Sequence, residues 1–311
     1  MNKDTEANVL DVVTALPWLQ GVAQDAFTFT RLGGMTNRVY RVEAPGIDSI
    51  IVRIPGVGTE AYIDRKGEIA NTRAAARTGV TPAVLFADLS TGIMVTQCVV
   101  NSMTMTPENF RLLKGSPGRA GVALRQLHQS GEEFAKRFEL FAMIEQYLAL
   151  LAEKNAQLPE GYHEVVKAAQ PVREALAAKP VKLAPCHCDP LTGNFLDDGS
   201  KMWIVDYEYG GMNDPMWDLG DLSVEAEFNE DLENEMLAAY FGRAPLAAEK
   251  GRMVIYKAMC DLLWTLWGLI QHANANPAED FWAYALQRFE RCQALMRSAD
   301  FPRYIEAIRA G

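Results

Sequence analysis

The feature that most constrains the fold is a change of pattern about a third of the way along the chain. Before residue 97, short runs of alternating apolar and polar residues lie between Gly-rich turns, which is typical of antiparallel strands. From about residue 101, apolar residues recur at helical spacing, and one island of strands at about 182–206 interrupts the helices. This order predicts an α+β fold with two lobes. The small N-lobe of antiparallel sheet plus one helix spans 1–97, a hinge spans 98–102, and a larger, mostly helical C-lobe spans 103–311.

The N-lobe is expected to follow the order β-β-β-α-β-β after a short helix that ends near Pro17. Its strands are expected over 27–31, 39–42, 49–54, 83–87 and 93–97, with the helix over 62–77. The C-lobe helices are expected over 116–129, 140–153, 162–177, 230–241, 250–272 and 278–298. A cleft between two such lobes is the expected ligand site.

Composition excludes several classes of protein. Of the 311 residues, 49% are hydrophobic and 23% are charged, which excludes a collagen, a coiled-coil rod and a disordered chain. The 40 acidic residues outnumber the 30 lysines and arginines, and the formal net charge is −10. No basic cluster suited to nucleic acid is visible, so no nucleic-acid partner is expected. An acidic surface also disfavours anionic membranes, but it tolerates a small cationic substrate.

The sequence gives no indication of membrane insertion or secretion. The nearly apolar run Leu262–Ile270 is far shorter than the ~20 residues that a bilayer requires. The N-terminus lacks the basic and apolar regions of a signal peptide. Five cysteines, an odd and sparse number, indicate free thiols in a reducing compartment, and a cytoplasmic location is expected. Cys186 and Cys188 have no second Cys/His pair at zinc-site spacing.

The strongest chemical signal is a polar loop between two strands. His187, Asp189 and Asn194 lie in the loop, and Asp206 follows the next apolar strand. Phosphoryl transfer uses such a set, because one carboxylate accepts the proton of the substrate hydroxyl while an amide oxygen and a second carboxylate hold Mg²⁺. Asn194 lies five residues after Asp189, as in the catalytic loop of kinases. His187 is expected to brace the loop rather than to react. The alternative is a polar turn with a capping aspartate.

A Gly-rich turn between the first two strands suits phosphate binding. Gly33 and Gly34 allow backbone N–H groups to approach phosphate oxygens, and Thr36 or Asn37 adds further donors. Glycine pairs of this kind also form simple hairpin turns, so the motif by itself is weak.

Arg53, at the end of the third strand, is a candidate fixed cation for phosphates, with Glu68 on the following helix as its candidate partner. Protein kinases carry lysine on the corresponding strand. The alternative is an arginine at the protein surface.

Two further motifs lie in the C-lobe. Asp214 and Pro215 suit the start of a helix. Asp218, one turn further on, is expected to hydrogen-bond the backbone of the catalytic loop. Trp264 and Trp267 share one face of a later apolar helix. Aromatic faces attract quaternary ammonium groups, although such residues more often pack in a core. The helix after it carries Phe281, Trp282 and Tyr284.

With these motifs established, the chain resembles the choline/ethanolamine kinases, and most closely the bacterial choline kinases. The match runs from about Leu32 to about Phe289. It is carried by the segments Leu32–Asn37, Val52–Gly56, His187–Asp189 with Asn194, Ile204–Tyr209 and Met212–Leu219. The last segment is the most specific, because the His-x-Asp-x4-Asn loop is shared with aminoglycoside, homoserine and thiamine kinases.

The resemblance implies a bilobal protein-kinase-like fold that uses ATP and Mg²⁺. It implies that Asp189 is the base, that Asn194 and Asp206 are the metal ligands, and that Arg53 contacts phosphate. Arginine at that position fits this family. Adenine is implied to meet backbone groups near Gln97 to Val99. The choline pocket of the family is aromatic with acids at its rim, and its matching positions are Tyr209, Glu225, Trp264, Trp267 and Tyr284.

The sequence therefore predicts an ATP-dependent phosphotransferase that acts on the hydroxyl of a small cationic alcohol, with choline as the first candidate. Ethanolamine, thiamine or another alcohol is the alternative, although ethanolamine requires more acceptors and fewer aromatic faces. A non-catalytic pseudokinase is disfavoured because every expected catalytic position is filled, and no feature supports a scaffold. A monomer or a homodimer is expected.

Overall fold

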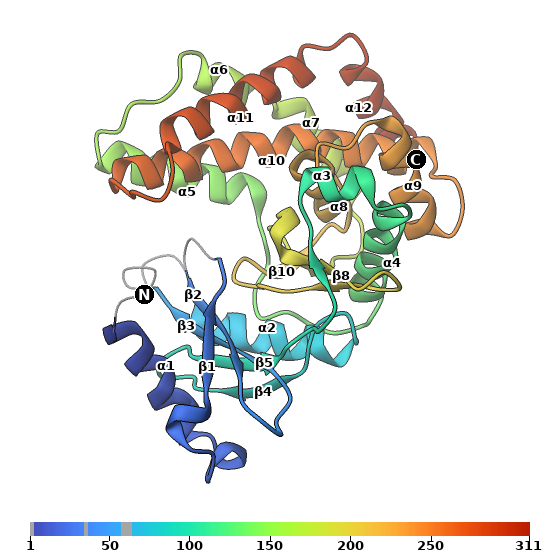
Figure 1. The fold of residues 1–311 in the computed structure, drawn as a ribbon. Helices are drawn as coiled ribbons and strands as arrows, with labels where there is room; N and C mark the ends of the chain where they lie inside the picture. Colours follow the sequence, from blue (N-terminus) through green and yellow to red (C-terminus); the bar gives the residue numbers. More distant parts are fainter. Residues whose placement is uncertain (1–2, 34–36, 57–63) are drawn as a thin grey trace.

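The computed structural model describes residues 3–33, 37–56 and 64–311, and it has two lobes of different composition (Figure 1). The smaller lobe contains a five-stranded antiparallel sheet in the order β1-β2-β3-β5-β4. Its elements are α1 (Lys3–Ala15), two 3-10 turns (Pro17–Leu19 and Gln24–Ala26), β1 (Thr28–Arg31), β2 (Asn37–Glu43), β3 (Ile50–Pro55), α2 (Arg65–Arg77), β4 (Val84–Ala87) and β5 (Met94–Gln97). The predicted strand and helix order of this lobe is confirmed.

The sheet holds together through apolar residues that repeat across its central strands. Tyr40 on β2 lies opposite Val52 on β3, which lies opposite Val95 on β5. All three are almost fully buried, and Val9 and Val13 of α1 belong to the same hydrophobic cluster. Full burial of such a side chain stabilises the fold by roughly 1.5–3 kcal/mol. Two of the phosphate-binding candidates, Asn37 on β2 and Arg53 on β3, therefore lie on a well-packed sheet.

Helix α2 joins the two lobes. Its first turn is capped by Asp64, whose Oδ1 accepts hydrogen bonds from the amides of Lys66 and Gly67, each at 3.1 Å. Farther along, Asn71 Nδ2 donates to the carbonyl oxygen of Gly210 in the C-lobe at 2.8 Å. The helix expected over 62–77 is confirmed from Arg65 onward, and positions 62 and 63 lie outside the described residues.

The larger lobe is mostly helical, as expected. Its helices are α3 (Pro107–Leu112), α4 (Ser116–His128), α5 (Leu140–Glu153), α6 (Tyr162–Ala168), α7 (Gln170–Ala178), α8 (Met216–Glu225), α9 (Glu230–Phe241), α10 (Ala247–Ala273), α11 (Phe281–Met296) and α12 (Phe301–Ala310). Helix α10 is central, and α5, α8, α11 and α12 pack around it (Figure 1). By length and composition α10 could cross a membrane, but its apolar window is 89% buried inside the protein. Packing within the lobe therefore accounts for its composition.

Short strands fix both ends of the predicted catalytic loop. β7 (Ala184–Cys186) pairs with β10 (Gly211–Asn213), and β8 (Phe195–Asp197) pairs with β9 (Met202–Ile204). β6 (Met103–Thr104) joins the other edge of β8. The loop leaves β7 and enters β8 through a 3-10 turn over Thr192–Asn194, so two separate ladders hold it. The expected island of strands is confirmed.

Some helices differ from expectation. The helix expected over 162–177 is two helices, α6 and α7, that meet at Ala169. Pro171 lacks an amide hydrogen and its ring clashes with the preceding turn, so the ladder of α6 cannot continue through it. Helices α3 and α12 were not expected. The division of the chain at 98–102 stays a prediction.

Candidate active site

The backbone of the catalytic loop is held by Asp218 on α8. Its Oδ2 accepts a hydrogen bond from the amide of His187 at 2.7 Å, and its Oδ1 accepts one from the amide of Cys188 at 2.8 Å. Cys188 has a φ of 67°, in the left-handed region that costs a non-glycine residue about 1 kcal/mol or more. Satisfying both amides stabilises this turn. His128 Nε2 contacts the same carboxylate at 2.8 Å and fixes its orientation. The expected role of Asp218 is confirmed.

His187 braces the loop, as expected. Its Nε2 lies 2.8 Å from the carbonyl oxygen of Val205 and so donates to it. Its Nδ1 accepts from the amide of Asp189 at 3.3 Å. Burial lowers the pKa of His187 and favours the neutral ring that these two partners require. Both ring nitrogens are therefore occupied by the backbone, which ties the loop to the segment that carries Asp206.

The carboxylate of Asp189 is half-buried and receives no hydrogen bond or ion pair from the described part of the chain. Burial raises the pKa of Asp189 well above the usual range, and the charge of Asp221 raises it further, followed by Glu208, Glu225 and Asp206. A carboxylate without a cationic partner, surrounded by other acids, is suited to a ligand that brings a hydroxyl and a positive charge.

The predicted convergence of Asp189, Asn194 and Asp206 is present. Asn194 Nδ2 donates to the backbone oxygen of Asp189 at 3.1 Å. The amide of Val205 donates to the backbone oxygen of Asn194 at 2.9 Å, which brings Asp206 beside the loop. Asp206 itself has a φ of 71°, so the chain turns sharply where β9 has ended. The three side chains therefore come from one loop and one hairpin end.

Arg53 lies between the lobes as a buried cation rather than at the surface. Its Nη1 forms ion pairs with Glu68 and with Asp206 Oδ1, the latter at 3.0 Å. Burial lowers the pKa of Arg53, but the neighbouring charges of Glu68 and Asp206 outweigh it and raise the pKa, so the guanidinium stays charged. Glu68 also receives Arg65 Nη1 at 2.9 Å. The predicted pair between Arg53 and Glu68 is formed. Together with the pair between Arg53 and Asp206, it links β3 and α2 to the segment that follows β9.

Glu208 belongs to the same cluster but was not among the predicted site residues. Its Oε2 accepts from Asn37 Nδ2 at 3.1 Å and lies 3.6 Å from Arg65 Nη1. Asn37 was expected to donate to phosphate, and in the structure it donates to Glu208. The available signal was a second acid two residues after Asp206.

The donor set fits Mg²⁺. The carboxylate oxygens of Glu68, Asp206 and Glu208 lie within 4.8 Å of one another. Because the amide nitrogen of Asn194 donates to Asp189, its Oδ1 is the atom left to face a cation. Mg²⁺ prefers oxygen ligands of this kind. All three acids pair with Arg53 or Arg65, so a cation would compete with these arginines for them. The predicted ligands are Asn194 and Asp206, and Glu208 is added to them as a third candidate.

The four predicted aromatic residues form one cluster, called here the aromatic box: Tyr209, Trp264, Trp267 and Tyr284. Trp267 Nε1 donates to the hydroxyl of Tyr209 at 2.9 Å, and its ring lies 5.8 Å from that of Tyr284. The ring of Trp264 meets Tyr209 edge-on at 5.4 Å. Trp264 is only 4% exposed and belongs to the C-lobe core, so most of its surface packs as a core residue does. The box is therefore rigid before any ligand enters.

Acidic residues of α8 line one side of the aromatic box. Glu225 Oε1 accepts from Arg288 Nη2 at 2.5 Å, and the Arg288 guanidinium lies 4.6 Å from the centre of the Tyr284 ring. Asp221, one turn earlier on α8, accepts from Trp264 Nε1 at 3.0 Å. Glu225 was predicted as a rim acid, whereas Asp221 was not predicted, because nothing in its sequence context indicates an indole partner.

The predicted nucleotide contacts are described only in part. Gly33 is exposed, and a Cβ there would meet no described atom within 4 Å. Gly34 and Thr36 lie outside the described residues. At the end of β5 the amide of Gln97 donates to Ala83 O at 3.0 Å, and the carbonyl oxygen of Val99 accepts from Ser102 Oγ at 2.9 Å. The contact of residues 97–99 with adenine stays a prediction.

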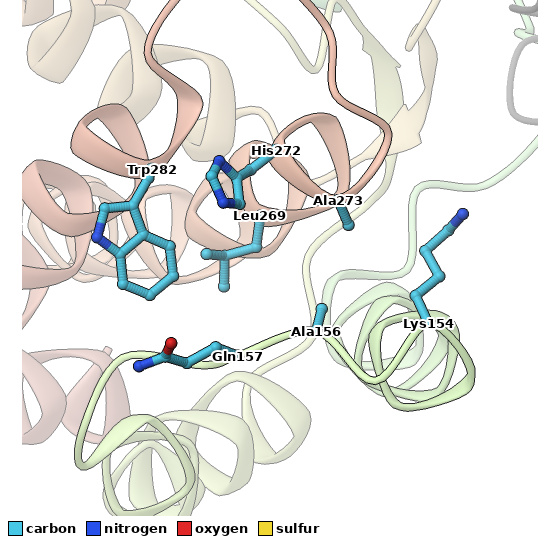
Figure 2. Close-up of a pocket in the computed structure, with 7 residues that line it drawn as sticks. All are labelled: Lys154, Ala156, Gln157, Leu269, His272, Ala273 and Trp282. Atoms are coloured by element: carbon cyan, nitrogen blue, oxygen red, sulfur yellow. The ribbon is translucent and has the colours of Figure 1, made fainter.

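A cavity of about 510 Å³ opens elsewhere in the C-lobe, where the ends of α5 and α10 meet the start of α11 (Figure 2). Its walls include Leu269 and the rings of His272 and Trp282, which are 5.6 Å apart, with Lys154 at α5. No predicted site residue lines it.

Comparison with known proteins agrees with this geometry. Residues 28–249 match the Phosphotransferase enzyme family. The crystal structure of a choline/ethanolamine kinase family protein from Mesorhizobium loti is 54% identical, with a TM-score of 0.89, and the match covers 98% of this chain and 99% of that one. The choline kinase LicA from Streptococcus pneumoniae is 28% identical with a TM-score of 0.78, covering 94% and 99%. Protein LicA of Haemophilus influenzae is 25% identical over 279 residues, 88% of this chain and 81% of that protein.

The family match spans well over half of the chain, and the Mesorhizobium protein is similar along almost its whole length. The structural likeness agrees with the two lobes described above. The chain therefore belongs to the phosphotransferase enzyme family and, within it, to the choline/ethanolamine kinases, as a choline kinase-like phosphotransferase.

Proposed function

We propose that the protein transfers the γ-phosphoryl group of ATP to the hydroxyl of choline. The observation that supports choline is the aromatic box, whose two indole N–H groups are both used within the protein, by Asp221 and by Tyr209. The box therefore offers ring faces rather than hydrogen-bond donors, and ring faces attract a quaternary ammonium group through cation–π contacts. Membership of a kinase family implies ATP as the phosphoryl donor.

In this proposal each residue of the loop has one task. Asp189 accepts a hydrogen bond from the substrate hydroxyl, orients it and takes its proton late in the transfer. His187 and Asp218 keep that carboxylate in place through the loop backbone. Asn194 and Asp206, with Glu208, would hold Mg²⁺, which when bound neutralises charge on phosphate oxygens. Arg53 adds a fixed positive charge between the lobes.

The aromatic box orients the substrate. With the ammonium group against Trp267 and Tyr284, the hydroxyl of a short alcohol extends toward Asp189, whose pKa is raised in part by acids near the box. Fixing the two reacting groups in this way lowers the entropic part of the barrier.

The test is ADP release from Mg-ATP with choline, ethanolamine, thiamine and an aminoglycoside as separate acceptors. Choline is expected to give the highest kcat/KM. If ethanolamine or thiamine exceeds it, the substrate assignment is wrong while the phosphotransferase assignment stands. We also propose a reducing, cytoplasmic location, supported by the five free thiols.

A further inference from the structure

Asp221 is a buried acid that the catalytic steps above do not use. It lies on α8 and faces α10, where its Oδ2 accepts from Trp264 Nε1 at 3.0 Å. Its side chain is fully buried, and its Oδ1 has no nitrogen or oxygen donor in the described part of the chain. A buried carboxylate with one unsatisfied oxygen costs stability unless a positive charge compensates it. The structure therefore keeps a costly acidic group at the edge of the Trp264 ring.

Burial and the neighbouring charges together decide how readily Asp221 ionises. Burial raises the pKa of Asp221 well above the usual range and Glu225 raises it further, while Arg288 opposes both. Arg288 is itself shared between Glu225, at 2.5 Å, and Asp261, at 3.2 Å. Asp261 is also held by Arg291 at 2.5 Å. The raised pKa favours the protonated form of Asp221, and a positive charge in the aromatic box would favour its ionised form.

The influence of Asp221 extends to the reacting end of the site. Its charge is the largest electrostatic contribution to the raised pKa of Asp189, and it also contributes to that of Tyr284. Because the carboxylate is inaccessible, a substrate cannot touch it. Any effect on the substrate therefore passes through the field of the carboxylate or through the ring of Trp264.

We infer that Asp221 is a positioning residue that makes the aromatic box selective for a positively charged substrate. It fixes the Trp264 ring through the indole N–H and, when a cation occupies the box, supplies a carboxylate at the edge of that ring. Cation–π attraction is electrostatic, so this charge strengthens it for a cation and does nothing for a neutral group of the same shape. The inference rests on the proposed function, because it assumes that the box holds the cationic end of the substrate.

The test is the variant Asp221→Asn, which keeps an oxygen acceptor for the indole but removes the charge. Steady-state kinetics compare choline with its neutral carbon isostere, dimethylbutanol. We expect the KM for choline to rise about tenfold, with kcat/KM for the isostere and the KM for ATP little changed. The preference for choline over the isostere then falls by the same factor. A residue with a purely structural role would change both acceptors equally.

Two further variants locate the effect. In a Trp264→Leu background the same Asp221→Asn change is expected to have less than about a twofold effect on the preference, because coupled residues are not additive. Asp197→Asn is the matched control, since Asp197 is also a buried acid but pairs with Arg119 at 2.6 Å, away from the aromatic box. It is expected to leave the preference unchanged, whatever its effect on stability.

An unchanged preference in Asp221→Asn, or an equal effect with and without Trp264, would overturn the inference while leaving the proposed function intact. Equal turnover of choline and the isostere by the wild-type protein would overturn both. If Asp221→Asn does not fold, Trp264→Phe is the deciding variant, because it keeps an aromatic ring but removes the N–H that donates a hydrogen bond to Asp221. A preference that survives Trp264→Phe undiminished contradicts the inference.

Discussion

The carboxylate of Asp189 is positioned by other residues' contacts with the loop backbone rather than by contacts of its own. Asp218 accepts hydrogen bonds from the two amides that precede Asp189. His187 accepts from the amide of Asp189, and Asn194 donates to the carbonyl oxygen of Asp189. The reacting side chain is thus free to meet a substrate while its main chain is immobile. Preorganisation of this kind favours a large effect of the side chain on the rate and a small effect on binding.

Asp189→Asn is expected to lower kcat by a factor of order 10²–10⁴, because it removes the acceptor for the hydroxyl proton. ATP affinity should stay nearly unchanged, because the phosphate-binding candidates are elsewhere. Steady-state kinetics with the best acceptor, together with ATP titration calorimetry, measure the two effects. A variant that retains more than half of the wild-type activity is incompatible with Asp189 as the base.

Trp267→Leu is expected to raise the KM for choline roughly 30-fold and to leave the KM for ATP little changed, because a desolvated cation–π contact is worth about 2 kcal/mol. Trp282→Leu is the matched control, since Trp282 is a half-buried tryptophan on α11 outside the aromatic box. It should leave the KM for choline unchanged. If Trp267→Leu, with Trp264→Leu beside it, binds choline normally in a folded protein, these tryptophans are core residues only.

Residues that are close in sequence were predictable, and those joined only by the tertiary fold were not. The spacing of Asp189, Asn194 and Asp206 indicated one loop and one hairpin, and the structure has both. The bonds of Glu208 to Asn37 and of Asp221 to Trp264 join residues far apart in the chain. No local pattern marks such partners. Arg53 was singled out from the sequence, but only the fold shows that it is buried between Glu68 and Asp206.

At the scale of elements, α2 couples the two lobes. It supplies Glu68 to the ion pairs around Arg53 and Asp206. Its Asn71 binds both the carbonyl oxygen of Gly210 and the amide of Ala135. A movement of α2 therefore changes the surroundings of Arg53 and Asp206 together.

Glu68→Gln tests this coupling. The variant removes the negative charge that pairs with Arg53 and Arg65. The side chains of Arg53 and Glu68 are only 10% and 0% exposed, so water cannot replace that charge. The free energy of unfolding should fall by about 3 kcal/mol, and the KM for ATP should rise because Arg53 loses its anchor. Chemical denaturation and steady-state kinetics measure both.

Glu132→Gln is the control for an ion pair at the other end of α2, because Glu132, in the segment after α4, pairs with Arg77 of α2, which is 62% exposed. Exposed ion pairs contribute little, so both readouts should stay near wild type. Equal behaviour of the two variants would show that the buried cluster does not link α2 to nucleotide binding.

Helix and strand prediction succeeded where a repeat was long and failed where packing decided. The long apolar repeat of α10 and the alternation in β2 and β3 were recognisable from sequence. The break at Ala169 depends on Pro171, and a proline in the first turn of a helix is as acceptable as one that ends a helix. The short helix α12 is fixed by burial of Phe301 and Ile308, which its local sequence does not reveal.

At the scale of the whole molecule, the accessibility of the cysteine thiols indicates how tightly the fold is packed. Cys186, Cys188, Cys260 and Cys292 are buried, and burial raises the pKa of each thiol. Cys98 is half-buried, and burial raises its pKa as well.

Only Cys98 is therefore expected to react with a disulfide reagent in the native protein, and more slowly than a free cysteine. A raised pKa lowers the thiolate fraction at a given pH, so the rate should increase as the pH rises toward that pKa. Thiol titration at pH 8 measures it, with Cys98→Ser to remove the reactive group and denatured protein to expose all five. Rapid reaction of two or more thiols would show that the C-lobe opens readily.

The most direct test of the account is a competition in one tube, with choline and ethanolamine at equal concentration and limiting Mg-ATP. Phosphorus NMR of the products gives the ratio of the two kcat/KM values, which is the specificity itself. An aromatic box that recognises a quaternary ammonium predicts phosphocholine in excess by about tenfold or more. Equal amounts of the two products, or an excess of phosphoethanolamine, would contradict the choline assignment.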